Sequence, residues 1–233
     1  ILCLVLLVSC SNEVPDDQLV GRDGVTYVVN STKPFTGSSV SYYENGQVEI
    51  RLNFKNGKTD GLGEKFYENG QLESRGNYKN GEVDGPGEWF YENGQLKSRG
   101  NFKNGKDNGL REWYYENGQL ESRTNWKDGE KHGLSEVFYE NGQLKSRENY
   151  KNGEKDGLWE VYNENGQPEE KTYYKNGRKV STTEFDYYEN GQLKVKGNYN
   201  NEKLHGLYES FYKNGQLKEK RNYKNGKLDG LTE

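Results

Sequence analysis

A four-residue turn sequence, Glu-Asn-Gly-Gln with one Lys variant, returns eight times along this chain. A spacing of 24 residues separates the turns at every step but one, and their glycines are Gly46, Gly70, Gly94, Gly118, Gly142, Gly166, Gly191 and Gly215. A fixed period of this length is typical of an array of identical supersecondary units, each packed mainly on its neighbours. We therefore expect the shared residues to hold the array together and the differing residues to carry function.

Two turn signals alternate within each unit. In the second 24-residue repeat they are Asn69-Gly70 and Asn80-Gly81, each set between stretches of strand-favouring side chains. Asn-Gly at such a place is the strongest short-range signal for a β-hairpin. The sequence thus predicts an all-β fold: an elongated single antiparallel β-sheet of successive hairpins, with about eight 24-residue units.

The spacing of the turns predicts a register. With Asn69-Gly70 as a two-residue turn, Tyr67 faces Leu72 and Glu64 faces Arg75. If equivalent residues of successive units stack without shear, Tyr78 faces Gly85 and residues 80–83 form a four-residue loop.

This register separates two faces. One face carries tyrosines, leucines and glycines, with aromatic rings beside glycines, and is the better candidate for burial. The opposite face carries the aromatic residues Phe66 and Phe90, with Glu73 and Lys97 in the same row. Its next row is a ladder of alternating charge whose pairs contribute about 0.2–1 kcal/mol each. The ladder residues are Glu64, Arg75, Glu88, Arg99, Glu112, Arg123, Glu136 and Arg147.

Composition limits both the core and the partners. Only 30% of the residues are hydrophobic, whereas there are 19 Tyr and 30 Gly, so a conventional thick core is not expected. The 37 acidic and 33 basic residues are interspersed almost evenly, which argues against nucleic-acid binding and against electrostatic adsorption to anionic lipid.

The repeating pattern resembles a known family. Tyr139 to Leu144 reads Tyr-Glu-Asn-Gly-Gln-Leu, and it is followed by Tyr150 to Glu154 and by Asp156 to Leu158. This pattern resembles the bacterial variant of the MORN (membrane occupation and recognition nexus) repeat from about residue 21 onward. The resemblance implies an elongated sheet of hairpins and a scaffolding or binding role; some relatives carry an antitoxin label and many are envelope lipoproteins.

The first ten residues differ in kind from the rest. An apolar run from Ile1 to Val8 has the length of a signal-peptide core and ends in Leu7-Val8-Ser9-Cys10, which resembles a bacterial lipobox. By that resemblance Cys10 is lipidated and Cys3 is removed, so disulfides and cysteine metal sites are excluded. We expect four segments: 1–10 signal, 11–21 tether, 22–45 N-terminal cap and 46–233 repeat array.

No enzyme site can be assembled from the repeat. The recurring serines have no histidine partner, and each recurring glutamate has a base opposite it. His132 and His205 replace an Asp before turn glycines, and a turn role is favoured there over ligation. No metal or cofactor is expected, because the carboxylate spacing of calcium loops is absent.

The residues that vary give candidate contacts for a partner. Trp89 and Trp113 share a row that other units fill with Lys65, Val137, Val161 or Ser210, and either local packing or a binding hot spot explains them. Between Gly177 and Gly191 one residue is inserted and the Asp-Gly step is lost, which predicts a disturbed ladder. The candidate partner-binding residues are Trp89, Trp113, Phe66, Phe90, Tyr114 and Phe138.

Three functions fit these observations. The first is a non-enzymatic envelope protein, lipid-anchored to an outer membrane or cell surface, whose repeated aromatic and charged face binds a protein or glycan, with surface adhesion as one use. The second is an antitoxin or immunity protein that occludes a toxin. The third is a passive spacer. A bare sheet edge leaves edge-to-edge self-association open.

Overall fold

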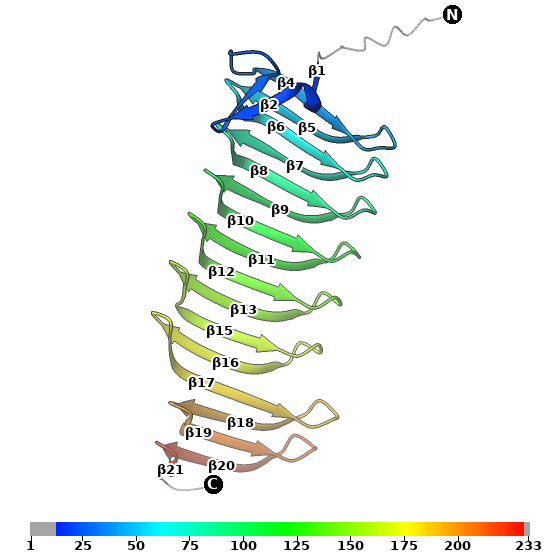
Figure 1. Cartoon of the computed structure of the whole chain (residues 1–233). Coiled ribbons are helices and arrows are strands. Elements are labelled where there is room, and N and C mark those ends of the chain that lie inside the picture. Colours follow the sequence, from blue (N-terminus) through cyan, green and yellow to red (C-terminus); the bar gives the residue numbers. More distant parts are fainter. Residues whose placement is uncertain (1–12, 231–233) are drawn as a thin grey trace, which may run out of the picture. The chain divides into compact units, whose positions relative to one another are not determined.

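The computed structural model describes residues 13–230, which divide into two compact units at residues 107 and 108. The first unit is a run of strands joined by tight turns (Figure 1). Its elements are β1 (Glu13–Pro15), η1 (Asp16–Gln18), β2 (Leu19–Arg22), β3 (Val25–Val28), β4 (Gly37–Tyr42), β5 (Val48–Lys55), β6 (Lys58–Phe66), β7 (Leu72–Lys79), β8 (Glu82–Phe90) and β9 (Leu96–Lys103).

The second unit continues the same pattern, and in both units each long strand pairs antiparallel with the strand that follows it. Its strands are β10 (Lys106–Tyr114), β11 (Leu120–Lys127), β12 (Glu130–Phe138), β13 (Leu144–Lys151), β14 (Glu154–Lys155), β15 (Gly157–Tyr162), β16 (Pro168–Lys175), β17 (Arg178–Tyr187), β18 (Leu193–Asn200), β19 (Lys203–Phe211), β20 (Leu217–Lys224) and β21 (Lys227–Leu228). The predicted all-β fold of successive antiparallel hairpins is confirmed.

The first hairpin loop is longer than predicted. Gly70 donates its N–H to the Tyr67 carbonyl at 2.8 Å, Tyr67 donates to the Gln71 carbonyl at 2.8 Å, and only Gly70 has positive φ, at +82°. This is a three-residue loop, a type I turn followed by a left-handed glycine. Tyr67 therefore lies opposite Gln71, and the predicted Tyr67–Leu72 pair is wrong.

One residue of β7 is left over as a result. Leu72 pairs with Phe66, but the next pair joins Ser74 to Lys65, so Glu73 has no opposite residue. The Glu73 carboxylate lies 2.9 Å from the Lys65 ammonium. Because Lys65 pairs with Ser74, this ion pair belongs to that face of the sheet, and the prediction that Glu73 lies beside Phe66 is wrong.

The second turn is shorter than predicted. Asn80 and Gly81 have φ of +53° and +94°, as a two-residue type I′ turn requires, and Lys79 pairs with Glu82. Tyr78 therefore pairs with Val83, not with Gly85. The local preference of Asn-Gly for this turn sets the register here.

The surplus residues of the 13-residue step form a bulge within the strand. Gly76 pairs with Gly87 and Tyr78 with Val83, so residues 84–86 all lie opposite Asn77. Within the bulge, Gly85 has φ of +116°, a backbone conformation that would be strained in a residue with a side chain. The aromatic residues still lie beside glycines, but these glycines are on the preceding strand: Tyr78 pairs with Gly61, and Phe102 pairs with Gly85.

Within each unit, tyrosine hydroxyls link one hairpin repeat to the next at the three-residue loops. Tyr67 donates its hydroxyl to the Phe90 carbonyl at 2.8 Å, 23 residues onward. The same bond recurs from Tyr43, Tyr115, Tyr139 and Tyr188. Burial raises the pKa of Tyr67, with the nearby Glu73 adding to the shift, so the hydroxyl keeps its proton and remains a donor.

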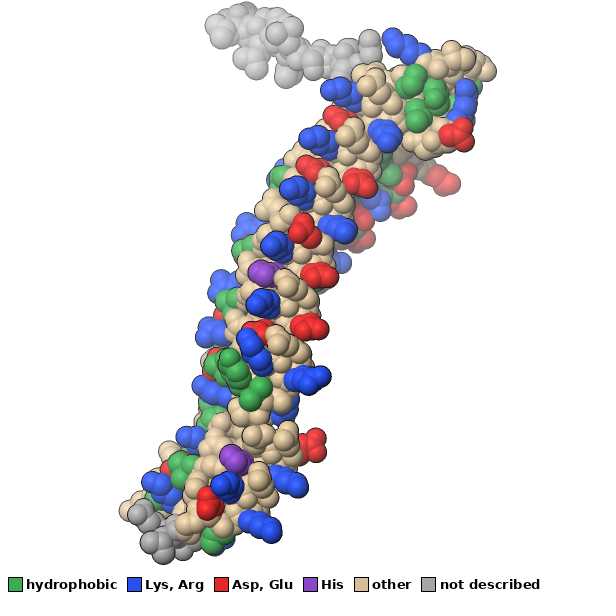
Figure 2. Space-filling view, turned by 90° about the vertical axis from the view of Figure 1, so that its left-hand side faces the viewer, with side chains coloured by type: hydrophobic (Ala, Val, Ile, Leu, Met, Phe, Trp, Pro, Cys, Tyr) green, Lys and Arg blue, Asp and Glu red, His purple; other side chains and the backbone are tan. Residues whose placement is uncertain are grey.

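A second link runs along the two-residue turns. The backbone N–H of Asn176 donates to Asp156 at 3.1 Å, 20 residues earlier. At two such positions a histidine takes the place of the Asp: His132 Nδ1 accepts from the Asn152 N–H, and His205 Nδ1 accepts from Asn225, both at 3.4 Å. These contacts give both histidines the turn role that the sequence favours. Figure 2 shows basic and acidic side chains interspersed along one side of the units.

The apolar core is thin. Among the described residues, the buried hydrophobic side chains are Phe35 and Val40, at 7% and 2% exposure. Most other buried side chains are serines, threonines and glutamates. Packing in the array therefore depends on glycine rows, hydroxyls and ion pairs. The thinness of the apolar core is what the low hydrophobic content predicts.

The N-terminal part of the first unit is more ordered than a tether. β1 pairs in parallel with β4, and the Glu13 carboxylate lies 2.6 Å from Arg51 in the place of a ladder glutamate. β2 and β3 form a small separate sheet, and Thr26 of β3 donates to the Gly57 carbonyl at 2.8 Å. The tether assigned to residues 11–21 is therefore wrong from residue 13 onward, because this segment protects the edge of β4.

The insertion between Gly177 and Gly191 changes the register, as expected. β17 has no Asp-Gly bulge; one extra residue, Val180, takes its place. Lys171 pairs with Thr183 in place of a glutamate, and the charge row resumes at Lys196 with Glu209 at 3.9 Å. The disturbed ladder is thus seen in the structure.

The predicted lipidation residue Cys10 and the predicted signal segment 1–10 lie outside the described residues. Between residues 13 and 230, no helix has the length and apolar character needed to span a membrane.

Candidate binding face

The tryptophans lie on a face that we call the Trp–Tyr face, defined in the first unit by side chains of β5 to β8. Lys65, Ser74 and Trp89 form one row across three neighbouring strands, because Ser74 pairs with both of the others. Gly63, Gly76 and Gly87 form the next row in the same way. The row of glycines leaves a backbone floor beside a row of larger side chains.

This face is hollowed in the first unit. A cavity of about 250 Å³ lies over the floor. Its lining is mainly apolar, with Ile50 and Leu52 from β5, Tyr78 and Val83 near the two-residue turn, and Trp89 from β8. Trp89 packs edge-on against Phe102, with ring centroids 5.6 Å apart. The half-buried Trp89 therefore has both a packing role and a surface that faces a hollow.

The second unit has a more open hollow of about 330 Å³ on the equivalent face. Trp113 and Trp126 line it together with Lys131 and Val137. The hydroxyl side chains of its floor are Ser122, Thr124 and Ser135. Thr124 and Ser135 are 5% and 2% exposed and share a hydrogen bond of 2.8 Å between their hydroxyls. This hollow is thus more polar than the one beside Trp89.

Further along the second unit, the charged groups Glu148 and Lys155 on this face contact aromatic side chains. Tyr150 donates its hydroxyl to Glu148 at 2.7 Å, and burial together with this bond raises the pKa of Tyr150 far above its ordinary value. Burial also lowers the pKa of Lys155. These groups offer hydrogen bonds and aromatic surface. In residues 13–230, no cluster of three or more His, Cys, Asp or Glu side chains is placed to hold a metal ion.

The charge ladder lies on the opposite face, which we call the ladder face. The structure pairs Glu64 with Arg75, Arg75 with Glu88, and Glu88 with Arg99 in the first unit. In the second unit it pairs Glu112 with Arg123, Arg123 with Glu136, and Glu136 with Arg147. All eight ladder residues thus take the register that the sequence predicts.

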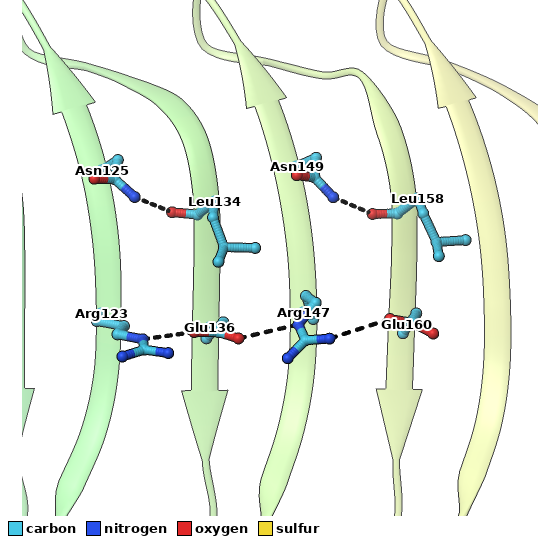
Figure 3. A network of polar contacts seen from close by, with 8 residues as sticks. All are labelled: Arg123, Asn125, Leu134, Glu136, Arg147, Asn149, Leu158 and Glu160. Carbon is cyan, nitrogen blue, oxygen red and sulfur yellow. Dashed lines mark hydrogen bonds and ion pairs between the residues drawn. The ribbon is translucent and has the colours of Figure 1, made fainter.

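Burial within the ladder is uneven (Figure 3). The Glu136 side chain is only 2% exposed and lies 2.5 Å from Arg123 and 3.0 Å from Arg147. Glu160 is 8% exposed and lies 2.8 Å from Lys171. Burial on its own raises the pKa of Glu160, but hydrogen bonds from Lys171 and Tyr162 outweigh it, and the net shift is downward. The lowered pKa means that the Glu160 carboxylate stays ionised although it is buried.

The predicted partner-binding residues do not share one face. Trp89 and Trp113 lie on the Trp–Tyr face, whereas Phe66, Phe90, Tyr114 and Phe138 follow the ladder row. All six are half-buried. The Arg75 guanidinium lies over the Phe90 ring at 6.0 Å, and Arg123 lies over Phe138 at 5.9 Å. Packing against ladder arginines accounts for these two phenylalanines.

Sequence comparison gives the family. Eight segments match the MORN repeat variant: residues 35–56, 59–80, 83–104, 107–128, 131–152, 155–176, 183–201 and 204–225. This chain belongs to the MORN repeat variant family. Most of the MORN segments run from one two-residue turn to the next. The segment 59–80, for example, begins just after Asn56-Gly57 and ends at Asn80, so a match of this kind covers one hairpin step of the array. The gap before residue 183 coincides with the altered register at β17.

Other comparisons add little. No curated protein sequence matches this chain. Among solved structures, the crystal structure of TcdB2–TccC3 is similar over 88% of this MORN chain, at 12% identity and a TM-score of 0.25. This chain spans only 16% of the length of that protein chain. At that score the likeness carries no functional argument.

Sequence reasoning missed two features of the MORN array. Glu13 extends the charge ladder from a segment without any repeat signal, and only the structure places it beside Arg51. The hollow over Gly76 was also missed, although Gly76 and Gly100 share a position that other units fill with Thr124 or Thr172. That difference between units was the available signal.

Proposed function

We propose that this protein is a non-enzymatic binding scaffold that holds a protein or glycan partner on its Trp–Tyr face. The observation that carries the proposal is the pair of hollows lined by Trp89 in the first unit and by Trp113 in the second. Concave surfaces with tryptophan in their walls are typical binding hot spots. The two residues are also among those that differ between repeats.

The ladder face is less suited to this role. Its phenylalanines pack under arginines, and its central charges are paired with one another, so a partner would have to displace contacts that already stabilise the sheet. Its exposed apolar side chains, such as Leu62 and Leu158, stand singly at bulges. Single exposed leucines are common on protein surfaces and need no partner.

We also propose that the scaffold is tethered to a bacterial cell envelope by lipid on Cys10, with surface adhesion as its use. Support comes from the sequence Leu7-Val8-Ser9-Cys10 after an apolar run. Metabolic labelling with a fatty-acid analogue tests the anchor, and Cys10→Ala should abolish incorporation. Equal incorporation in the variant would refute it, and a cytosolic product without lipid would favour the antitoxin alternative.

Capture of partners by residues 13–230 tests the binding role. The immobilised protein is offered envelope proteins and glycans, and we compare it with Trp89→Val and Trp113→Val. Valine occupies the same row at Val137 and Val161, so both variants should fold. Leu62→Ser on the ladder face is the control. Captured material should be lost with the tryptophan variants and kept with the control; capture of nothing at micromolar concentration would leave a passive spacer.

A further inference from the structure

One glycine of the floor in the first unit differs from its neighbours. The central row contains Gly63, Gly76, Gly87 and Gly100, and all of these except Gly76 are buried. Gly76 is part-exposed and borders the 250 Å³ hollow. Its φ is not positive, so backbone conformation does not require a glycine there.

The neighbouring glycines are covered by aromatic rings. A Cβ on Gly63 would lie 2.7 Å from the Tyr78 ring, and one on Gly87 would lie 2.9 Å from the Trp89 ring. A Cβ on Gly76 would meet nothing closer than 3.9 Å. The rings of Tyr78 and Trp89 thus stand over the glycines on either side and leave Gly76 bare between them.

Packing within this chain does not account for the bare position. Other repeats carry a side chain at the equivalent position: Leu52, Thr124, Glu148 and Thr172. Two of these, Thr124 and Thr172, are buried there. The fold therefore accepts a side chain at this place. Here, glycine leaves room for a group from another molecule.

The chemistry of the hollow defines that group. Ile50, Leu52 and Val83 add apolar surface to the two rings. The polar groups Lys65 and Ser74 lie at one end, and the Lys65 ammonium is neutralised by Glu73 at 2.9 Å. Glu64 and Arg75 also border the hollow, but their charges are paired along the ladder. A charge-neutral slot of this kind complements an uncharged ring with one polar end.

We propose that the hollow over Gly76 receives an aromatic side chain of a protein partner, with tyrosine as the best fit. Its ring lies between Tyr78 and Trp89, and its hydroxyl reaches toward Ser74 and Lys65. The volume of about 250 Å³ is below the range of pockets for whole small molecules and suits one anchor residue. A sugar ring would bury more hydroxyl groups than this lining can satisfy. This inference rests on the proposed binding role and names the partner chemistry of one site.

Nuclear magnetic resonance of the isotope-labelled protein tests the site without the natural partner. The probes are N-acetyl-tyrosinamide, N-acetyl-alaninamide and methyl β-glucopyranoside, added in millimolar amounts. The Trp89 indole N–H and the Gly76 amide should shift saturably with the tyrosine probe alone. Gly76→Thr, which copies Thr124, should weaken binding by at least about tenfold, because its side chain fills the slot.

Two further variants keep the test decisive. Trp89→Val removes one wall and should also weaken tyrosinamide binding, read at the Gly76 amide. Leu62→Thr introduces the same residue on the ladder face and should leave binding unchanged. Equal binding of alaninamide, preference for the glucoside, absence of saturable shifts, or undiminished binding by Gly76→Thr would each overturn the site. None of these results bears on whether the scaffold captures a partner elsewhere, which the capture experiment decides.

Discussion

Glu136 is the most stringent test of the charge ladder, because its carboxylate is buried between two arginines. Its side chain is 2% exposed and accepts from Arg123 at 2.5 Å and from Arg147 at 3.0 Å (Figure 3). Glu136→Gln keeps the shape but removes the charge. The amide then presents its NH2 group to one of the two guanidinium groups, so one acceptor is lost and a donor faces a donor.

The expected cost follows from burial. A hydrogen bond to a charged group contributes about 1.5–3 kcal/mol, but both arginines are 46% exposed and water can solvate what they lose. We therefore expect Glu136→Gln to lower the free energy of unfolding by about 2 kcal/mol. Glu64→Gln is the matched control in the first unit: Glu64 is 23% exposed and lies 3.4 Å from Arg51, so its replacement should cost about 0.5 kcal/mol.

Hydrogen exchange separates the two variants, because a repeat array can open locally and need not unfold in one step. A loss of about 2 kcal/mol predicts roughly 30-fold faster exchange of the amides in β11 to β13. Urea unfolding should show the same ranking. Salt at 1 M should leave most of the Glu136 effect in place, since buried pairs are screened little. Equal costs at Glu136 and Glu64 would show that burial does not set the strength of the ladder.

Two further predictions concern contacts within the first unit. Tyr67→Phe should lower the free energy of unfolding by about 1 kcal/mol, because the Phe90 carbonyl loses its donor. Burial raises the folded pKa of Tyr67, so the stabilisation by its hydroxyl is full below the unfolded pKa and is lost as pH rises through the folded pKa. Circular dichroism should therefore show that the variant loses less stability than the parent protein in alkali. Gly57→Ala should cost about 1–3 kcal/mol more than Gly81→Ala in urea unfolding. Both glycines have positive φ, but only a Cβ at Gly57 would lie 2.8 Å from the Thr26 carbonyl oxygen. Equal costs would contradict this reasoning.

The sequence predicted the charge ladder and missed the loop geometry for one physical reason. Opposite charges specify which residues face each other in the middle of the strands, and Glu64 does pair with Arg75. At the strand ends, the register depends on the turn type. Asn80-Gly81 closes as a two-residue turn but Asn69-Gly70 does not, because Asn69 instead accepts the Gln71 N–H at 2.9 Å. The dipeptide alone does not distinguish the two outcomes.

The candidate site illustrates the other limit of sequence reasoning. Trp89 differs from the residues that most other repeats have in its row, and this difference alone makes it a candidate from the sequence. Gly76 differs from Thr124 and Thr172 at its position of the repeat, but Gly100 shares that difference, so the sequence alone does not single out Gly76. Only the positions of the Tyr78 and Trp89 rings show that one of these glycines is bare.

The division of labour between shared and varying residues follows from how the array is stabilised. The shared tyrosine, asparagine and ladder residues contact the neighbouring hairpin, so a change in one of them disturbs two hairpins. Residues that vary between repeats and border a hollow lie outside this shared set, and their replacement changes the shape of the surface. Glycine or threonine at the position of Gly76, and tryptophan or valine at that of Trp89, are such replacements. The same hairpin scaffold can therefore present a different pocket in each repeat, and the slot over Gly76 is one of these.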